Sequence, residues 1–323
     1  MLSLHSKERG EMTRKLIASF GQGNVVFHLL ALAIVCIWGV TFISTKILLM
    51  AGLTPSDILF YRFVLAYVCI CLCSRPFKLF ANSVKDEFLF VAAGFFGGTL
   101  YFMTENTALE YTLVSNVALI CSTTPLLTML VQCFFIQRVR PDKRQVAGSV
   151  LAFLGVGAVI FNSSFVFNLN PVGDLLCLTS ALSWTLYTLV TKYLSGTYSA
   201  LFIVRKTFFY GMVTLIPVLV HHSLTFSADV LLDSEVWSRL FFLGIVASFL
   251  CFMLWNVCLR RLNTLVVSNY IYLVPVVSIC TSSLILGEAV NAVLVVGAVL
   301  VVTGMYVAGK SKGIVTTKRK GKG

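Results

Sequence analysis

Charged residues are scarce in this sequence, and their scarcity excludes most classes of protein. Of 323 residues only 12% are Asp, Glu, Lys or Arg, which is about half the share found in soluble globular domains. Hydrophobic residues make up 58% of the chain, and the mean hydropathy is +0.91. An ordinary soluble domain is excluded by this composition, so we predict an integral membrane protein.

The sequence also lacks room for a soluble catalytic domain. Ten apolar segments fill almost the whole chain, each near the roughly 20 residues that a helix needs to cross a bilayer. They lie at about 25–50, 56–74, 87–108, 113–136, 144–161, 172–193, 200–220, 237–259, 264–286 and 290–309. Short connections and two polar tails, 1–24 and 310–323, are all that remains, so an ATPase domain of ordinary size is excluded.

The residue groups that intramembrane enzymes use are not assembled. Such enzymes need paired carboxylates, a His-Glu-x-x-His motif or an activated serine within their spans. His28 stands at the start of an apolar segment, and His221 and His222 fall in a predicted loop. The ten cysteines lie almost wholly in apolar segments, where cysteine behaves as a small apolar residue. We therefore expect no enzyme activity, no catalytic residue, no metal site and no cofactor.

The net charge of +12 follows the predicted topology. With the N-terminus in the cytoplasm, basic residues fall on the cytoplasmic side in loop after loop, and Asp229, Asp233 and Glu235 fall in the longer outer loop. This pattern is the positive-inside rule, and it predicts cytoplasmic termini in the cytoplasmic (inner) membrane. The charge thus marks orientation and not a nucleic-acid partner, and the long first segment is predicted to be a retained span, not a cleaved signal.

A Trp, a Thr and a Lys recur at identical spacing in two apolar segments. These are Trp38-Gly-Val-Thr-Phe-Ile-Ser-Thr-Lys46 and Trp184-Thr-Leu-Tyr-Thr-Leu-Val-Thr-Lys192. Further pairs follow in the same order: Arg62 with Arg205, Pro125 with Pro275, and Gly148 and Gly155 with Gly297 and Gly304. We predict one five-helix unit that occurs twice, at 25–161 and at 172–309.

Because five is odd, the second copy must enter the membrane from the opposite side. The predicted architecture is an all-α integral membrane fold of ten transmembrane helices in two inverted five-helix repeats. Inverted repeats of this kind build secondary transporters, whose substrate site lies near the bilayer midplane where the copies meet. A secondary transporter is therefore predicted, with an intramembrane enzyme and a non-transporting sensor or scaffold as alternatives.

Several of these residues together resemble a known family. The run from Trp38 to Lys46, Arg62, the segment from Ala108 to Ser115 before Pro125, and Leu286-Gly-Glu288 are similar to the EamA-type branch of the drug/metabolite transporter superfamily. The resemblance covers residues 25–309. It implies ten helices in two inverted repeats around a central cavity, and export or exchange of small metabolites such as amino acids.

Polar groups inside a span indicate candidate sites, because a charge at a helix centre costs about 2.5–3.5 kcal/mol to insert. Glu105 follows Tyr101 by one helical turn, so both can project from one face, and Asn106 lies beside them. Two roles are open for Glu105: uptake of a coupling proton, or a structural pairing with an arginine such as Arg62.

Aromatic and amide side chains inside spans are the candidates for the transport path. The predicted substrate-pathway residues are Trp38, Phe42, Tyr101, Glu105, Asn106, Asn116, Trp184, Tyr187, Trp255, Asn256 and Tyr270. Packing or interfacial anchoring is the alternative role, since Trp and Tyr favour the headgroup level. Structural or gating roles are predicted for Arg62, Arg205, Pro125 and Pro275.

The predicted partners are a small-molecule substrate and the lipid bilayer, with a proton as a candidate coupling ion. The predicted oligomeric state is a monomer or a weak homodimer. Paired glycines permit close approach of helices, and we expect them to serve packing within the chain.

Overall fold

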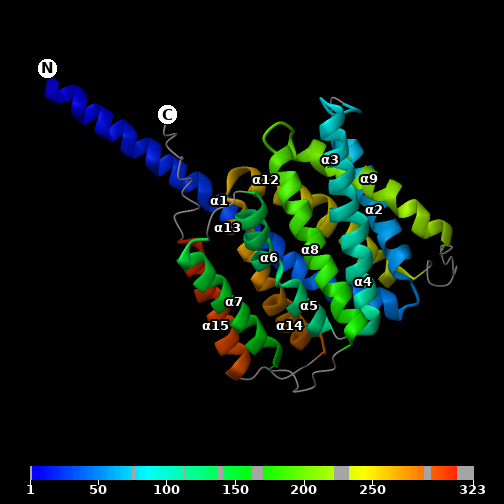
Figure 1. The fold of residues 1–323 in the computed structure, drawn as a ribbon. Coiled ribbons are helices and arrows are strands. Elements are labelled where there is room, and N and C mark those ends of the chain that lie inside the picture. The colour runs from blue at the N-terminus through cyan, green and yellow to red at the C-terminus, as the bar shows by residue number, and fades with distance from the viewer. Residues whose placement is uncertain are drawn as a thin grey trace.

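The structure is a computed structural model that describes residues 2–74, 78–112, 114–136, 141–161, 170–221, 233–286 and 292–310. Within these residues the chain is helical and contains no strand (Figure 1). The elements are α1 (Leu2–Met50), α2 (Pro55–Cys73), α3 (Val84–Gly94), η1 (Phe95–Leu100), α4 (Tyr101–Tyr111), α5 (Val114–Cys121), α6 (Thr124–Leu130), η2 (Val131–Ile136), α7 (Lys143–Phe161), α8 (Pro171–Leu194), α9 (Ala200–His221), α11 (Ser234–Phe241), η3 (Phe242–Leu250), α12 (Cys251–Arg261), α13 (Thr264–Asn269), η4 (Tyr270–Tyr272), α14 (Leu273–Leu286) and α15 (Ala292–Gly309).

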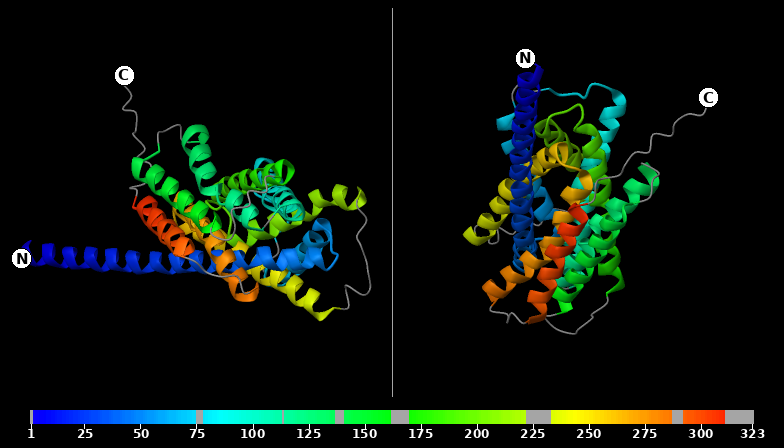
Figure 2. Two further views of the ribbon diagram at one scale, coloured as in Figure 1. Left: turned by 90° about the horizontal axis from the view of Figure 1, so that it is seen from below. Right: turned by 90° about the vertical axis from the view of Figure 1, so that its left-hand side faces the viewer.

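Six helical segments of the described chain are long and apolar enough to cross a membrane. They are Val25–Met50, Pro55–Cys73, Val84–Tyr111, Ala200–His221, Ser234–Arg261 and Thr264–Thr281. The N-terminal part of α1 projects away from the bundle as one straight helix (Figure 2). The all-α membrane fold is therefore observed, whereas ten spans and inverted repeats stay predictions.

Local sequence signals explain where the helices begin. The Thr54 hydroxyl accepts a hydrogen bond from the Asp57 backbone N–H, and the Asp57 carboxylate accepts one from the Thr54 backbone N–H, so the two residues form a capping box at the start of α2. Gly52 makes the preceding turn with a φ of 97°, which glycine adopts without a steric penalty. The Asn170 side chain caps α8 by accepting hydrogen bonds from the backbone N–H groups of Val172 and Gly173, and Pro171 follows at the first helical position.

Helices near both repeat prolines are interrupted. Helix α5 ends at Cys121 and α6 begins at Thr124, one residue before Pro125. In the second half, η4 separates α13 from α14, and Pro275 lies in the first turn of α14. A proline lacks the N–H that would bond the carbonyl four residues earlier, which is that of Cys121 for Pro125 and of Ile271 for Pro275, and this loss explains both interruptions. At the first break the Cys121 carbonyl instead accepts a hydrogen bond from the Thr124 hydroxyl at 2.7 Å.

Three segments of the described chain are π-helical, η1, η2 and η3, and η1 and η3 lie at corresponding places in the two predicted repeats. Segments η1 and η3 each accept a hydrogen bond from the first helix of the other predicted repeat. The Trp38 indole donates to the Ala247 carbonyl in η3 at 3.1 Å, and the Ser183 hydroxyl donates to the Phe96 carbonyl in η1 at 2.7 Å. Segments of π-helix occur often at functional sites, and here they join the halves.

Helices α7 and α15 pack closely against each other through glycines. A Cβ atom at any of these glycines would clash with the facing helix. A Cβ on Gly148 would lie 2.4 Å from the Ala308 nitrogen, and one on Gly304 would lie 2.4 Å from the Ala152 nitrogen. Gly155 likewise faces the backbone of Gly297. Because numbers rise along α7 as they fall along α15, the two helices run antiparallel.

Polar contacts join α9 to α3 and to the loop before α3. Lys206 on α9 forms an ion pair with Glu87 on α3, and the Tyr210 hydroxyl donates to the same carboxylate. Arg205 donates to the backbone carbonyl of Lys78 in the loop before α3. We call this group the polar latch.

Apolar side chains join the N-terminal end of α2 to α11. Leu48 and Leu53, around the turn between α1 and α2, and Ile58 on α2 are buried against Val236 and Leu240 of α11. We call this group the apolar latch. Corresponding interfaces of the two halves thus use different chemistry.

The repeated lysines bind helix ends. The Lys46 ammonium donates to the Leu109 carbonyl at 2.6 Å, near the C-terminus of α4. Lys192 donates to the carbonyls of Leu259 and Leu262 at the C-terminus of α12. Terminal carbonyls lack intrahelical partners and carry the negative end of the helix dipole, so a cation stabilises them.

Replacing Lys192 with methionine is therefore expected to lower the free energy of unfolding by about 1–2 kcal/mol, and Lys46→Met by less, because Lys46 reaches one carbonyl. Thermal unfolding in detergent micelles measures both. Lys85→Met is the control, since Lys85 is exposed. Equal midpoints for all three variants would show that the lysines do not act as caps.

Candidate functional site

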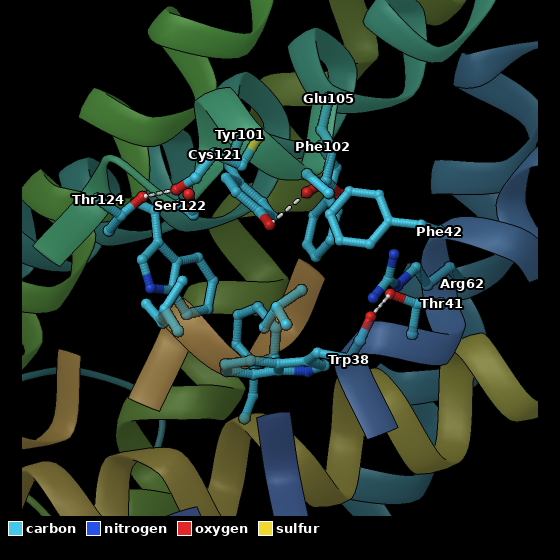
Figure 3. Close-up of a pocket in the computed structure, with 15 residues that line it drawn as sticks. Trp38, Thr41, Phe42, Arg62, Tyr101, Phe102, Glu105, Cys121, Ser122 and Thr124 are labelled. Carbon is cyan, nitrogen blue, oxygen red and sulfur yellow. Dashed lines mark hydrogen bonds between the residues drawn. The ribbon is translucent and has the colours of Figure 1, made fainter. Parts of the chain in front are cut away.

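A small cavity lies between α1 and α8 (Figure 3). Its volume is about 50 Å³, which is room for several water molecules. Elements from both halves contribute to its wall, which is mostly aromatic. The lining residues are Trp38, Thr41, Phe42, Arg62, Tyr101, Phe102, Glu105, Ala118, Cys121, Ser122, Thr124, Trp184, Phe252, Ile271 and Val274.

The two repeat tryptophans meet at this cavity. Their ring centroids lie 5.1 Å apart, with the rings nearly perpendicular at 87°. Phe252 lies edge-on to Trp184 at 5.4 Å, and the Tyr101 ring lies 4.9 Å from Trp184 on another side. Edge-to-face contacts of this kind hold aromatic rings in fixed positions, so the site is a rigid aromatic box.

One basic and one acidic group face this box. Arg62 on α2 is only 2% exposed; its Nε donates to the Ser248 hydroxyl at 2.5 Å, and its guanidinium lies 4.0 Å from the centroid of the Phe102 ring. Glu105 on α4 is 7% exposed and accepts a hydrogen bond of 2.5 Å from the Tyr101 hydroxyl. Figure 3 shows the Tyr101–Glu105 bond and places Arg62 beside Phe42 and Thr41.

Arg62 and Glu105 do not form an ion pair. Among the residues that the structure describes, the ion pairs within 4.0 Å are Lys206–Glu87 and Arg239–Glu235. A buried charge needs a partner or water, because its desolvation is costly. The two opposite charges therefore share one small cavity where water or a ligand can reach both.

Several polar side chains in or beside the box have no hydrogen-bond partner within the described structure, and the Trp255 indole nitrogen is among them. Others are the Trp184 indole nitrogen and both amide atoms of Asn106, a fully buried residue on α4. Leaving a buried polar group unpaired costs about 1–3 kcal/mol. Such groups are the ones that a bound ligand or water would satisfy.

The remaining predicted pathway residues occupy other places. Tyr187 packs its ring against Gly97 in η1, where any Cβ would clash, and accepts a hydrogen bond of 2.8 Å from Asn256. Trp255 is fully buried, with its ring 4.9 Å from Trp38, in the layer behind the box. Tyr270 lies outside the box and bonds His28 at 2.8 Å.

The corresponding arginines have different surroundings. Arg62 lines the box, whereas Arg205 belongs to the polar latch. Asn116 is on α5, and its side chain falls outside the part of the chain that the structure describes.

Sequence reasoning missed several lining residues. Phe102, Phe252 and Thr41 line the box, as do Cys121 and Thr124 at the break before Pro125. One signal was available: a proline in mid-span interrupts its helix, and the residues just before it are placed beside any central cavity. No comparable signal points to Phe252 among 26 phenylalanines.

The residues from Gly304 to Ser311 match the letters of a nucleotide-phosphate loop, Gly-x-x-x-x-Gly-Lys-Ser. That motif binds phosphate in the loop between a strand and a helix, where its backbone N–H groups are free. Here Gly304 to Gly309 form the last turns of α15, so the context is missing. Within the described residues there is also no cluster of three His, Cys, Asp or Glu side chains able to hold a metal.

Comparisons with known proteins agree with this architecture. A model of the EamA-like transporter family matches residues 26–161 and 171–309. An uncharacterized transporter of Archaeoglobus fulgidus is 25% identical over 286 residues, covering 88% of this chain and 97% of that protein. A probable amino-acid metabolite efflux pump of Salmonella typhimurium is 26% identical over 293 residues, covering 86% and 93%. One crystal structure has the same fold, with a TM-score of 0.70 at 18% identity over 89% of this chain and 96% of that chain.

Proposed function

Because the chain belongs to the EamA-like transporter family and is a multi-pass membrane protein, we propose that it is a secondary carrier that exports or exchanges a small organic zwitterion. The proposed substrates are amino acids or related compounds. The proposed setting is the cytoplasmic membrane, with both termini in the cytoplasm and ten spans in two inverted repeats. Relatives named as transporters and efflux pumps agree with a role other than catalysis.

The observation that carries the proposal is the pair of opposite charges at the aromatic box. A zwitterion presents a carboxylate and an ammonium group a few bonds apart. Arg62 would bind the carboxylate, since a guanidinium recognises carboxylates with several donors at once, and Glu105 would bind the ammonium. The unpaired Trp184 indole nitrogen supplies a further donor, and the box encloses the side chain. The Salmonella relative's printed name supports amino-acid metabolites as the substrate class.

Alternating access is the proposed mechanism. The box lies between α1 and α8, the first helices of the proposed halves, and the two latches lie on either side of it along α2. Release of one latch while the other stays closed would open the box to one side at a time. The small volume of the cavity, about 50 Å³, fits a box that must open to admit an organic substrate.

The test is flux into proteoliposomes that hold the purified protein. We expect counterflow of labelled amino acids with the unchanged protein, loss of counterflow with Arg62→Met, and normal counterflow with Arg239→Met. Arg239 is the control because it pairs with Glu235 on an exposed helix surface. Thermal unfolding of each variant separates lost transport from lost folding. Absence of flux for any amino acid with folded protein would refute the proposal and favour a sensor or scaffold.

A further inference from the structure

A second, larger cavity lies away from the aromatic box, among α1, α13–η4 and α15. Its volume is about 360 Å³. His28 and Lys310 stand at the ends of two apolar helices, α1's span and α15, on the same side of the molecule, and both line this cavity. The cavity therefore lies at the level where a spanning helix meets the headgroup region. We call it the lateral groove.

The polar part of the groove consists of hydrogen-bond donors. Lys310 is exposed and holds its ammonium 4.4 Å above the ring centroid of Tyr306. Asn269 is 4% exposed, lines the groove, and its amide nitrogen has no hydrogen-bond partner. His28 and Tyr270 bond each other at 2.8 Å along the same wall. Among the described lining residues there is no carboxylate, so the polar part suits an anion.

The rest of the groove is apolar. Val302 and Met305 of α15 line it, and Val266 of α13 faces them. Val302 is 57% exposed, and Val299 one turn away is 59% exposed, so the apolar wall continues along the outer surface of α15. An occupant must therefore carry an anionic head and a hydrocarbon part.

The sequence around Lys310 favours a membrane lipid over a soluble anion. Beyond Lys310 the chain carries Lys312, Lys318, Arg319, Lys320 and Lys322 and no acidic residue. Basic clusters directly after a membrane span attract anionic lipids, and basic pockets between spans bind their phosphate headgroups. These observations share no residue with the aromatic box.

We propose that the lateral groove binds an anionic phospholipid. The Lys310 ammonium and the Asn269 amide hold its phosphate, and an acyl chain lies along Val302 and Met305. The ligand is a resident of the membrane and is distinct from the transported zwitterion.

The test uses the full-length protein, delipidated in detergent and titrated with phosphatidylglycerol or phosphatidylcholine. A ligand that binds only the folded state raises the unfolding midpoint in proportion to its affinity. We expect phosphatidylglycerol to raise the midpoint and to stay bound in native mass spectra, and phosphatidylcholine to do neither. Lys310→Met with Asn269→Leu should weaken binding at least about tenfold.

Two single variants separate a built site from general attraction to positive charge. Asn269→Leu leaves the net charge unchanged and should still weaken phosphatidylglycerol binding. Lys85→Met removes a charge from another exposed lysine above a tyrosine ring, that of Tyr193, and should leave binding unchanged. The proposal is overturned if phosphatidylcholine or inorganic phosphate stabilises as well as phosphatidylglycerol, or if the double variant binds normally. Loss of amino-acid counterflow in Asn269→Leu with unchanged lipid binding would instead assign the groove to the transport path.

Discussion

Replacing Glu105 with glutamine is expected to abolish substrate accumulation driven by a pH gradient, and to weaken counterflow without abolishing it, because the amide oxygen can still accept a hydrogen bond from the substrate ammonium. Glutamine keeps the size of the side chain and can still accept the Tyr101 hydrogen bond, but it cannot release a proton. A gradient of one pH unit supplies about tenfold accumulation of substrate for each coupled proton. In the variant, the pH gradient should produce no accumulation. Proteoliposomes with an imposed pH gradient measure accumulation, and the same vesicles without a gradient measure counterflow.

Glu110→Gln is the matched control for this experiment. Glu110 lies on the same helix, α4, but it is exposed. It should behave like the unchanged protein in both assays. Equal loss of accumulation and counterflow in Glu105→Gln would indicate that Glu105 only holds the site together or only binds substrate, and would remove it as the coupling group.

Gly148→Ala and Gly304→Ala are each expected to destabilise the protein strongly. Either Cβ would come within 2.4 Å of a backbone nitrogen on the facing helix, and backbone cannot move aside as a flexible side chain can. Overpacking of a close interface costs about 1–3 kcal/mol, so each thermal midpoint should fall by several degrees. Unfolding in detergent micelles measures the effect.

The double variant sharpens this prediction. Once one alanine has forced α7 and α15 apart, the second has space, so the combined loss should be smaller than the sum of the two. Gly196→Ala is the control, because the nearest heavy atom to its Cβ would be 3.4 Å away. Fully additive losses would mean that the two glycines do not share one contact.

Sequence patterns located the centre of the molecule better than its wall. Trp38 and Trp184 recur at one spacing on the first helix of each predicted repeat, and inverted repeats place their substrate site where the two copies meet. The structure brings their rings to 5.1 Å. Helix periodicity shows which residues share a face, but how far a helix is rotated toward its neighbours depends on packing. For this reason Phe252 was missed and Tyr270 lies in the lateral groove.

The repeat in the sequence also predicts that corresponding residues have the same surroundings, and the structure shows that some do not. Arg62 and Arg205 correspond, and both are buried, but one reaches the Ser248 hydroxyl and the other the Lys78 carbonyl. Two repeats can share one backbone fold while the side chains around a given position differ between them. A charge near the start of a span therefore indicates a helix-packing position, and only the contacts show which copy faces the cavity.

The two latches would respond differently to temperature. Opening the apolar latch exposes hydrocarbon such as Leu48 and Val236 to water, which raises the heat capacity, whereas opening the polar latch around Glu87 and Lys206 exposes polar surface, which lowers it. If the carrier opens its two ends in turn, the Arrhenius plots of the two halves of its cycle should curve in opposite senses. Cooling would then change which half-cycle limits the rate, and the protein would spend its waiting time facing a different side of the membrane.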